Sequence, residues 1–195
     1  MRFEPNIETL MDVITRRRIP DRIPNYEPYY NLRTVSNVLS RPVSEDNLIT
    51  RDDYRVFVQA MIDYQLTIRC DFVPVYLKGP DLPMRRVSER TDSENENYDT
   101  HRDIPTIVNR EDYERYPWPD ESQMGLSDPD KLMLDTMAEM LPPGMGVVAF
   151  RKGIFEVMLQ LLGYDEFSYF LADHPQIVDE MADRLGQINL RLDQE

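Results

Sequence analysis

The side chains best suited to chemistry in the later part of the chain follow one short apolar run. Arg151 comes directly after Val147–Phe150, and Glu156 and Gln160 lie just beyond it, four positions apart on one face of a predicted helix. An arginine in this place can hold a carboxylate through two hydrogen bonds, and a pocket carboxylate can contact a substrate or a metal. The alternatives are a surface ion pair for Arg151 and an acid stabilised by the helix dipole for Glu156.

Further candidates follow two earlier segments. Tyr76 and Lys78 end the apolar run Asp71–Leu77, and a lysine that is removed from water can act as an acid or a base. Tyr26 and Glu27 follow a shorter segment bounded by prolines, where they either line a pocket or pack at a proline turn. No catalytic residue is assigned, and the candidate substrate-binding residues are Tyr26, Glu27, Tyr76, Lys78, Arg151, Glu156 and Gln160.

Short apolar strands that alternate with helices must position these side chains. Val147–Phe150 lacks polar alternation, as expected of a strand covered on both faces, and Ile154–Leu162 is predicted as the helix that follows it. Asp71–Leu77 and Arg22–Tyr26 are predicted as earlier strands, and Asp71 is expected to serve structure at the start of its strand. This alternation predicts an α/β fold with parallel strands, whose loops at the carboxyl ends of the strands carry the chemistry.

Helical spacing and capping residues predict the remaining elements. Ile7–Arg18 is predicted as an amphipathic helix with Arg16–Arg18 at its basic end, whereas Ile104–Val108 is predicted as a short strand and 81–103 as an exposed acidic excursion. The inner face of the first helix is predicted to contain Leu10, Met11, Val13 and Ile14. Further helices are predicted over Asn31–Leu39, Thr50–Leu66, Asp128–Met140, Tyr164–Ala172 and Pro175–Arg191, and Asn109–Asp120 is predicted as a capped helical turn that an aromatic and proline-rich segment ends.

Composition excludes several classes of function. The formal net charge of −14 argues against nucleic acid as a partner, because such binding depends on Lys and Arg that face phosphates. Apolar runs are too short for a membrane span, and the start of the chain lacks the apolar core of a secretory signal. Cys70 is the single cysteine, and its spacing from His101 and His174 fits no zinc pattern, so no metal site is predicted. A cytoplasmic protein that acts on a small molecule is the resulting expectation.

Several segments, taken in order, resemble the uroporphyrinogen decarboxylase-like superfamily. The segment Tyr-Glu-Arg-Tyr-Pro-Trp-Pro-Asp at 113–120 is similar to one common in that family, and Gly-Ile-Phe-Glu at 153–156 follows in family order. The other similar segments are Arg18–Pro24, Asp71–Val75, Leu162–Phe167 and Asp173–Arg184. The resemblance therefore touches most of the chain outside residues 81–102.

The resemblance implies a (β/α)8 TIM-type barrel that is normally far longer than this chain. Residues 1–195 are thus expected to form one partial barrel domain, the N-terminal half of an apparently incomplete barrel. The implied reaction is the decarboxylation of a carboxylated tetrapyrrole in porphyrin biosynthesis, which needs no cofactor because the pyrrole ring takes up the electrons. The alternative within the superfamily is a cobamide-dependent methyltransferase, whose zinc and corrinoid partner would require a C-terminal half.

A third possibility is a non-catalytic fragment that needs a complementary half. Three family positions differ here: Asn25–Asn31 lacks the paired arginines that hold the substrate, Lys78 stands near the central aspartate, and Gln160 stands at the tyrosine. A half barrel also leaves strand edges and an apolar face uncovered. The chain by itself is therefore expected to be inactive, and to self-associate or to bind a complementary half-barrel.

Overall fold

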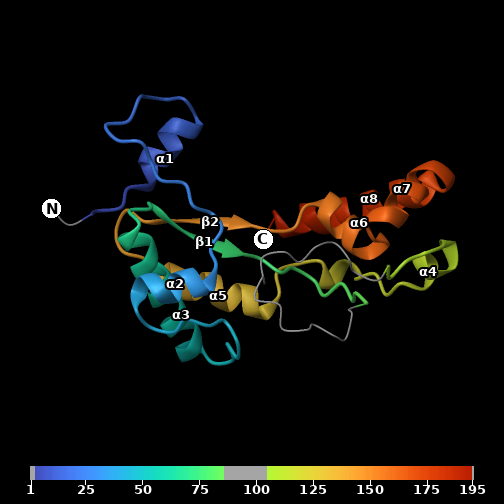
Figure 1. Ribbon diagram of the computed structural model, residues 1–195, viewed down its shortest axis with the longest axis horizontal. Coiled ribbons are helices and arrows are strands. Elements are labelled where there is room, and N and C mark those ends of the chain that lie inside the picture. The colour runs from blue at the N-terminus through green and yellow to red at the C-terminus, as the bar shows by residue number, and fades with distance from the viewer. Residues whose placement is uncertain (1–2, 86–104, 195) are drawn as a thin grey trace. The chain divides into compact units, whose positions relative to one another are not determined.

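The computed structural model describes residues 3–85 and 105–194 (Figure 1). The chain forms two compact units, Met1–Leu77 with Asp128–Phe150, and Lys78–Ser127 with Arg151–Glu195. The predicted mixed α/β character is confirmed, with most of the described residues in helices and a small parallel sheet. Most of the predicted acidic excursion, from residue 86 onward, lies outside the described residues.

The first unit is built on a two-stranded parallel sheet. β1 (Phe72–Tyr76) pairs with β2 (Gly146–Phe150) in a register that places Phe72 beside Gly146 and Tyr76 beside Phe150. Both strands and their parallel direction agree with the sequence analysis. The predicted strand Arg22–Tyr26 is reduced to one parallel bridge between Asn25 and Cys70, because Pro20 and Pro24 have no N–H to donate to a ladder.

Helices cover β1 on both faces. Val73 and Val75 point into a core shared with α2 (Leu32–Leu39), α3 (Arg51–Thr67) and α5 (Asp128–Met140). Phe72 points the opposite way, toward Leu10 of α1 (Ile7–Ile14). Figure 1 shows α2, α3 and α5 gathered on one side of the strands and α1 on the other.

The predicted start of α3 is confirmed in detail. The Thr50 hydroxyl accepts a hydrogen bond from the Asp53 backbone N–H, and the Asp53 carboxylate accepts one from the Thr50 N–H. This reciprocal pair is a capping box that satisfies donors at the start of the helix. The hydrogen bonds from Thr50 lower the pKa of Asp53.

A single carboxylate organises the amino end of β1. The buried Asp71 accepts a hydrogen bond at Oδ1 from the Asn6 backbone N–H at 2.7 Å and forms an ion pair with Arg22 through the same oxygen. Gly144 lies directly against the backbone of Pro5, because a Cβ at that position would lie 2.3 Å from the Pro5 backbone oxygen. The predicted structural role of Asp71 is thus confirmed.

The predicted inner face of α1 is wrong in part. Leu10 is buried, but Met11, Val13 and Ile14 are exposed. The helix also ends at Ile14, four residues before the predicted end, and Arg16 adopts a positive φ of 55°. The basic run therefore lies beyond the helix, where Arg18 turns back to pair with Asp12.

The predicted full burial of the second strand is also wrong. The side chains of β2 are half-buried, and Ala149 is exposed. Among the described residues β2 pairs with β1 alone.

The second unit is helical and contains α4 (Arg110–Arg115), η1 (Glu121–Gln123), α6 (Ile154–Leu162), α7 (Tyr164–Asp173) and α8 (Pro175–Leu192). The residues expected on the inner face of the last helix are buried: Ile177, Val178, Met181, Leu185, Ile188 and Leu192. The described part of the strand predicted at Ile104–Val108 is not a strand, because the N–H groups of Thr106 and Ile107 both bond to the Leu161 carbonyl of α6. None of the helices in the described ranges is long and apolar enough to cross a membrane.

Candidate functional site

An aromatic row lies along one face of the β1–β2 sheet and continues to the carboxyl ends of the strands. Tyr76 and Tyr29 both pack edge-on against Phe150, with ring centroids 5.4 and 5.3 Å away, respectively. Tyr26 packs against Phe72 with a centroid distance of 5.3 Å. We define the aromatic row as Tyr26, Tyr29, Phe72, Tyr76 and Phe150.

Strand register explains why these rings share a face. Side chains alternate along a strand, so Phe72 and Tyr76 point the same way, and their paired positions Gly146 and Phe150 point with them. This face is opposite the one that packs on α2, α3 and α5. Tyr26 and Tyr29 reach it from the segment that follows the Asn25–Cys70 bridge.

The row becomes more open toward the carboxyl ends of the strands. Phe72 is fully buried and Tyr76 is half-buried, whereas the Tyr29 side chain is 73% exposed. Aromatic rings that are held by edge-on contacts and open to solvent can pack against a planar or apolar ligand. The arrangement is therefore suited to binding a ring system.

The structure places two of the three candidates of the first unit on one face of the sheet, at opposite ends of β1. Tyr26 and Tyr76 belong to the aromatic row. Glu27 instead lies near Tyr64 of α3, where its negative charge adds to burial in raising the pKa of the Tyr64 hydroxyl.

Arg151 is held within the second unit by the end of α8. Its guanidinium donates to the side-chain and backbone oxygens of Asn189 at 3.1 and 3.2 Å, and it pairs with Asp193 at 2.8 Å. These partners support the ion-pair interpretation of Arg151 over that of an anion-holding residue. The cation also satisfies a carbonyl in the last turn of α8, where positive charge is favourable.

Two of the remaining candidates, Glu156 and Gln160, lie on α6. Glu156 is exposed, and a Cβ at Gly153 would lie 2.4 Å from its Oε2, so the carboxylate folds back over the helix N-terminus. This geometry supports the dipole interpretation. Gln160 accepts a hydrogen bond from the Lys152 ammonium at 2.7 Å, and Lys78 is exposed.

The part of the chain that the structure describes contains no group of three or more His, Cys, Asp or Glu placed to hold a metal ion. Cys70 is buried, and its thiol donates to the Asn25 carbonyl at 3.3 Å. Burial raises the pKa of this thiol. His101 lies outside the described residues.

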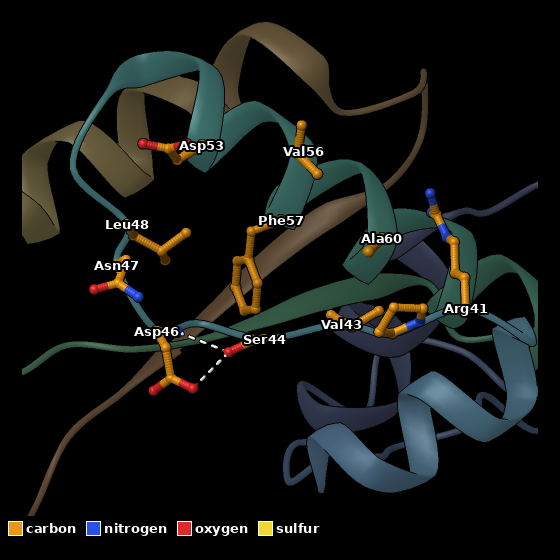
Figure 2. Close-up of a pocket in the computed structure, with 11 residues that line it drawn as sticks. Arg41, Val43, Ser44, Asp46, Asn47, Leu48, Asp53, Val56, Phe57 and Ala60 are labelled. Carbon is orange, nitrogen blue, oxygen red and sulfur yellow. Dashed lines mark hydrogen bonds between the residues drawn. The ribbon is translucent and has the colours of Figure 1, made fainter.

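Sequence analysis missed a hollow of about 220 Å³ beside α3, which Figure 2 shows. The segment from Arg41 to Leu48 forms one wall, and Val56, Phe57 and Ala60 of α3 form the other. The sequence indicates a loop here, and the exposed Val56 of α3 lies beside it. Phe150 was also missed as a site residue, because its position opposite Tyr76 depends on the strand register.

No protein-family model, curated protein or solved structure matches the chain.

Proposed function

We propose that this chain supplies the first strands of a uroporphyrinogen decarboxylase-like (β/α)8 barrel and acts on a carboxylated tetrapyrrole or a related ring compound. The observation that carries the proposal is the aromatic row at the carboxyl ends of parallel strands, where barrel enzymes bind their substrates. Each of the four pyrrole rings of a tetrapyrrole is flat, and flat rings pack well against aromatic side chains such as those of the row. Tyr26, Tyr29, Tyr76 and Phe150 are the proposed contacts.

The pairing of consecutive segments supports the barrel part of the proposal. Asn25 pairs in parallel with Cys70 just before β1, and β1 pairs in parallel with β2. In a (β/α)8 barrel each strand likewise pairs with the next strand of the chain. The helices α2, α3 and α5, which lie between these segments in the sequence, cover the face that would be the outside of the barrel.

Porphyrin binding by the full 195-residue chain tests the proposal. Titration with uroporphyrin, followed by porphyrin absorbance, is expected to show saturable binding that Tyr29→Ala weakens roughly tenfold, because one stacking ring is lost. Tyr169→Ala is the matched control, since this tyrosine is similarly exposed but lies on α7 in the second unit. No binding by the wild-type chain, or an equal loss in the control, would refute the proposed site.

A second candidate is a non-catalytic half that becomes complete with a complementary partner. It is favoured by the half-buried apolar side chains of β2, which a further strand would cover. The two candidates differ in turnover rather than in binding. Decarboxylation of uroporphyrinogen by the chain supports the first, whereas porphyrin binding without turnover supports the second.

A further inference from the structure

A loop at the amino end of the sheet is closed by one carboxylate. Asp71 bonds both Asn6 and Arg22 through the same oxygen, so the chain between these residues leaves the sheet and returns to almost the same point. We call residues 6–23 the clasped loop. It contains α1 and lies on the side of the strands opposite α2 and α3 (Figure 1).

The clasped loop carries aliphatic side chains that its own unit does not cover. Ile19 and Ile23 are 95% and 93% exposed, and Ile14 is also exposed. These values are far above those of an ordinary surface aliphatic residue, which is partly covered by its neighbours. Such a group of apolar side chains points to an interaction surface.

The same loop is basic in an acidic protein. Residues 6–23 contain four arginines against three acidic residues, Glu8, Asp12 and Asp21, so their formal charge is +1, whereas the whole chain has a formal net charge of −14. Arg18 and Arg22 are paired with Asp12 and Asp71. Arg16 and Arg17 form no ion pair among the described residues, so they remain available to an acidic partner.

The hollow beside α3 complements the apolar and basic side chains of the clasped loop. Its floor is apolar, with Phe57 and Ala60 below the exposed Val56, and its rim carries the carboxylates of Asp46 and Asp53 (Figure 2). Each polar side chain among these is satisfied locally: Asp46 bonds Ser44 at 2.7 Å, and Asp53 caps α3.

The positive charge of Arg41 on this rim is compensated within the unit. Its guanidinium pairs with Asp63 of α3 at 2.6 Å, so the mouth of the hollow stays acidic. The volume of about 220 Å³ is several times the ~30 Å³ that a water molecule occupies, which is enough room for an isoleucine side chain.

We propose that the clasped loop of one copy docks into the α3 hollow of a second copy, with Ile19 and Ile23 on the apolar floor and Arg16 and Arg17 at the acidic rim. The loop cannot reach the hollow of its own chain, because α1 and α3 lie on opposite faces of the same sheet. An anionic membrane is the weaker partner, since two available arginines provide little attraction for a chain of net charge −14.

The contact is head-to-tail, which determines how copies of the chain assemble. Each copy uses its loop on one neighbour and its hollow on another, so wild-type copies add to one another in chains or rings. Burial of one exposed isoleucine strengthens association by roughly tenfold to a hundredfold. The contact should also weaken at high salt, because surface charges are screened.

Two variants of the full chain test this geometry by sedimentation velocity over a range of concentrations. The loop variant, Ile19→Ser with Ile23→Ser, and the hollow variant, Val56→Lys, change exposed side chains and should retain the wild-type melting curve. Each variant alone is expected to stay monomeric at concentrations where the wild type associates. Leu190→Ser, an exposed aliphatic residue on α8 of the second unit, is the matched control and should associate like the wild type.

A mixture of the two variants gives the decisive result. The loop variant keeps an intact hollow and the hollow variant keeps an intact loop, so an equimolar mixture should form one-to-one pairs and nothing larger. A monomeric wild type overturns the proposal, as does a mixture that fails to pair. Variants that associate as strongly as the wild type would locate the contact elsewhere, for example at the β2 edge. Binding of the wild type to anionic vesicles without self-association would identify a membrane surface instead.

Discussion

Replacing Asp71 should loosen the first unit at its amino end, and the effect can be worked out from its contacts. The carboxylate is fully buried and receives the Asn6 backbone N–H and the Arg22 guanidinium at Oδ1, while Oδ2 is buried without a partner. Asp71→Ala removes both hydrogen bonds and the clasp that closes the loop. Asp71→Asn keeps an acceptor for both donors but removes the charge.

The loss of stability depends on how well water hydrates the Asn6 N–H and the Arg22 guanidinium once the carboxylate is removed. A hydrogen bond to a charged group contributes about 1.5–3 kcal/mol and a neutral one about 0.5–1.5 kcal/mol. Arg22 is 38% exposed and Asn6 is exposed, so both groups recover much of their hydration when the partner is lost. We therefore expect Asp71→Ala to lower the free energy of unfolding by about 3 kcal/mol and Asp71→Asn by about half of that.

Urea unfolding and limited trypsin digestion together measure the effect. The free energy of unfolding comes from the urea midpoint, and the opening of the clasped loop appears as faster cleavage at Arg16–Arg18. Asp63→Ala is the matched control, because Asp63 also pairs with an arginine but its side chain is 40% exposed, and its loss should cost less than about 1 kcal/mol. If Asp71→Ala alters neither measurement, or if Asp63→Ala alters both as much, the role assigned to Asp71 is wrong.

Three further predictions concern the same unit. Gly144→Ala should destabilise it by at least about 2 kcal/mol in urea, because φ is +84° and the new Cβ would meet the Pro5 oxygen at 2.3 Å; Gly186→Ala, with its nearest atom at 3.7 Å, should not destabilise the chain. Burial raises the pKa of Tyr30 to about 12, so stability is complete below pH 10 and falls by about 3 kcal/mol as the pH rises through 12, which alkaline unfolding monitored by tyrosine absorbance would reveal. The buried Cys70 thiol, whose pKa is raised, should resist a disulfide reagent at pH 8 and react at once in urea; rapid reaction of the folded chain would contradict its burial.

Much of the fold could be predicted because the helices carry strong local signals. The last helix has an uninterrupted apolar face, and the start of α3 has a capping box that can be seen in the sequence as Thr50 and Asp53. The two strands were predicted from short β-branched runs bounded by turn residues. These signals act within a few residues of one another, so no tertiary information is needed to find them.

The errors fall where a distant partner decides the outcome. The segment Pro105–Val108 is apolar enough for a strand, but the Leu161 carbonyl at the end of α6 takes its N–H groups. Val147–Phe150 is apolar throughout, yet its side chains are half-buried or exposed, and among the described residues β2 pairs with β1 alone. Hydrophobic periodicity indicates which side chains of a segment can be buried. It does not indicate which other segments will cover them.

The same contrast between local signals and distant partners applies to the candidate site residues. Tyr26 and Tyr76 were predicted from their positions after strands, and the structure places Tyr26 against Phe72 at the amino end of β1 and Tyr76 at the carboxyl end. Glu27 remains a predicted binding residue, and its charge adds to burial in raising the pKa of Tyr64. Arg151 forms an ion pair with Asp193, some forty residues later in the chain, and no local sequence pattern predicts that partner.

The two ends of β1 perform different tasks, and the segment before it connects them. Asp71 at the amino end fixes Arg22, and the Asn25–Cys70 bridge fixes the chain three residues later. Tyr26 follows at once, so its contact with Phe72 depends on both attachments. Substitution of Asp71 should therefore weaken ring binding at the aromatic row without removing any ring from it. The stability of the amino end and the geometry of the proposed ligand surface are thus one property of this chain, set by a buried carboxylate.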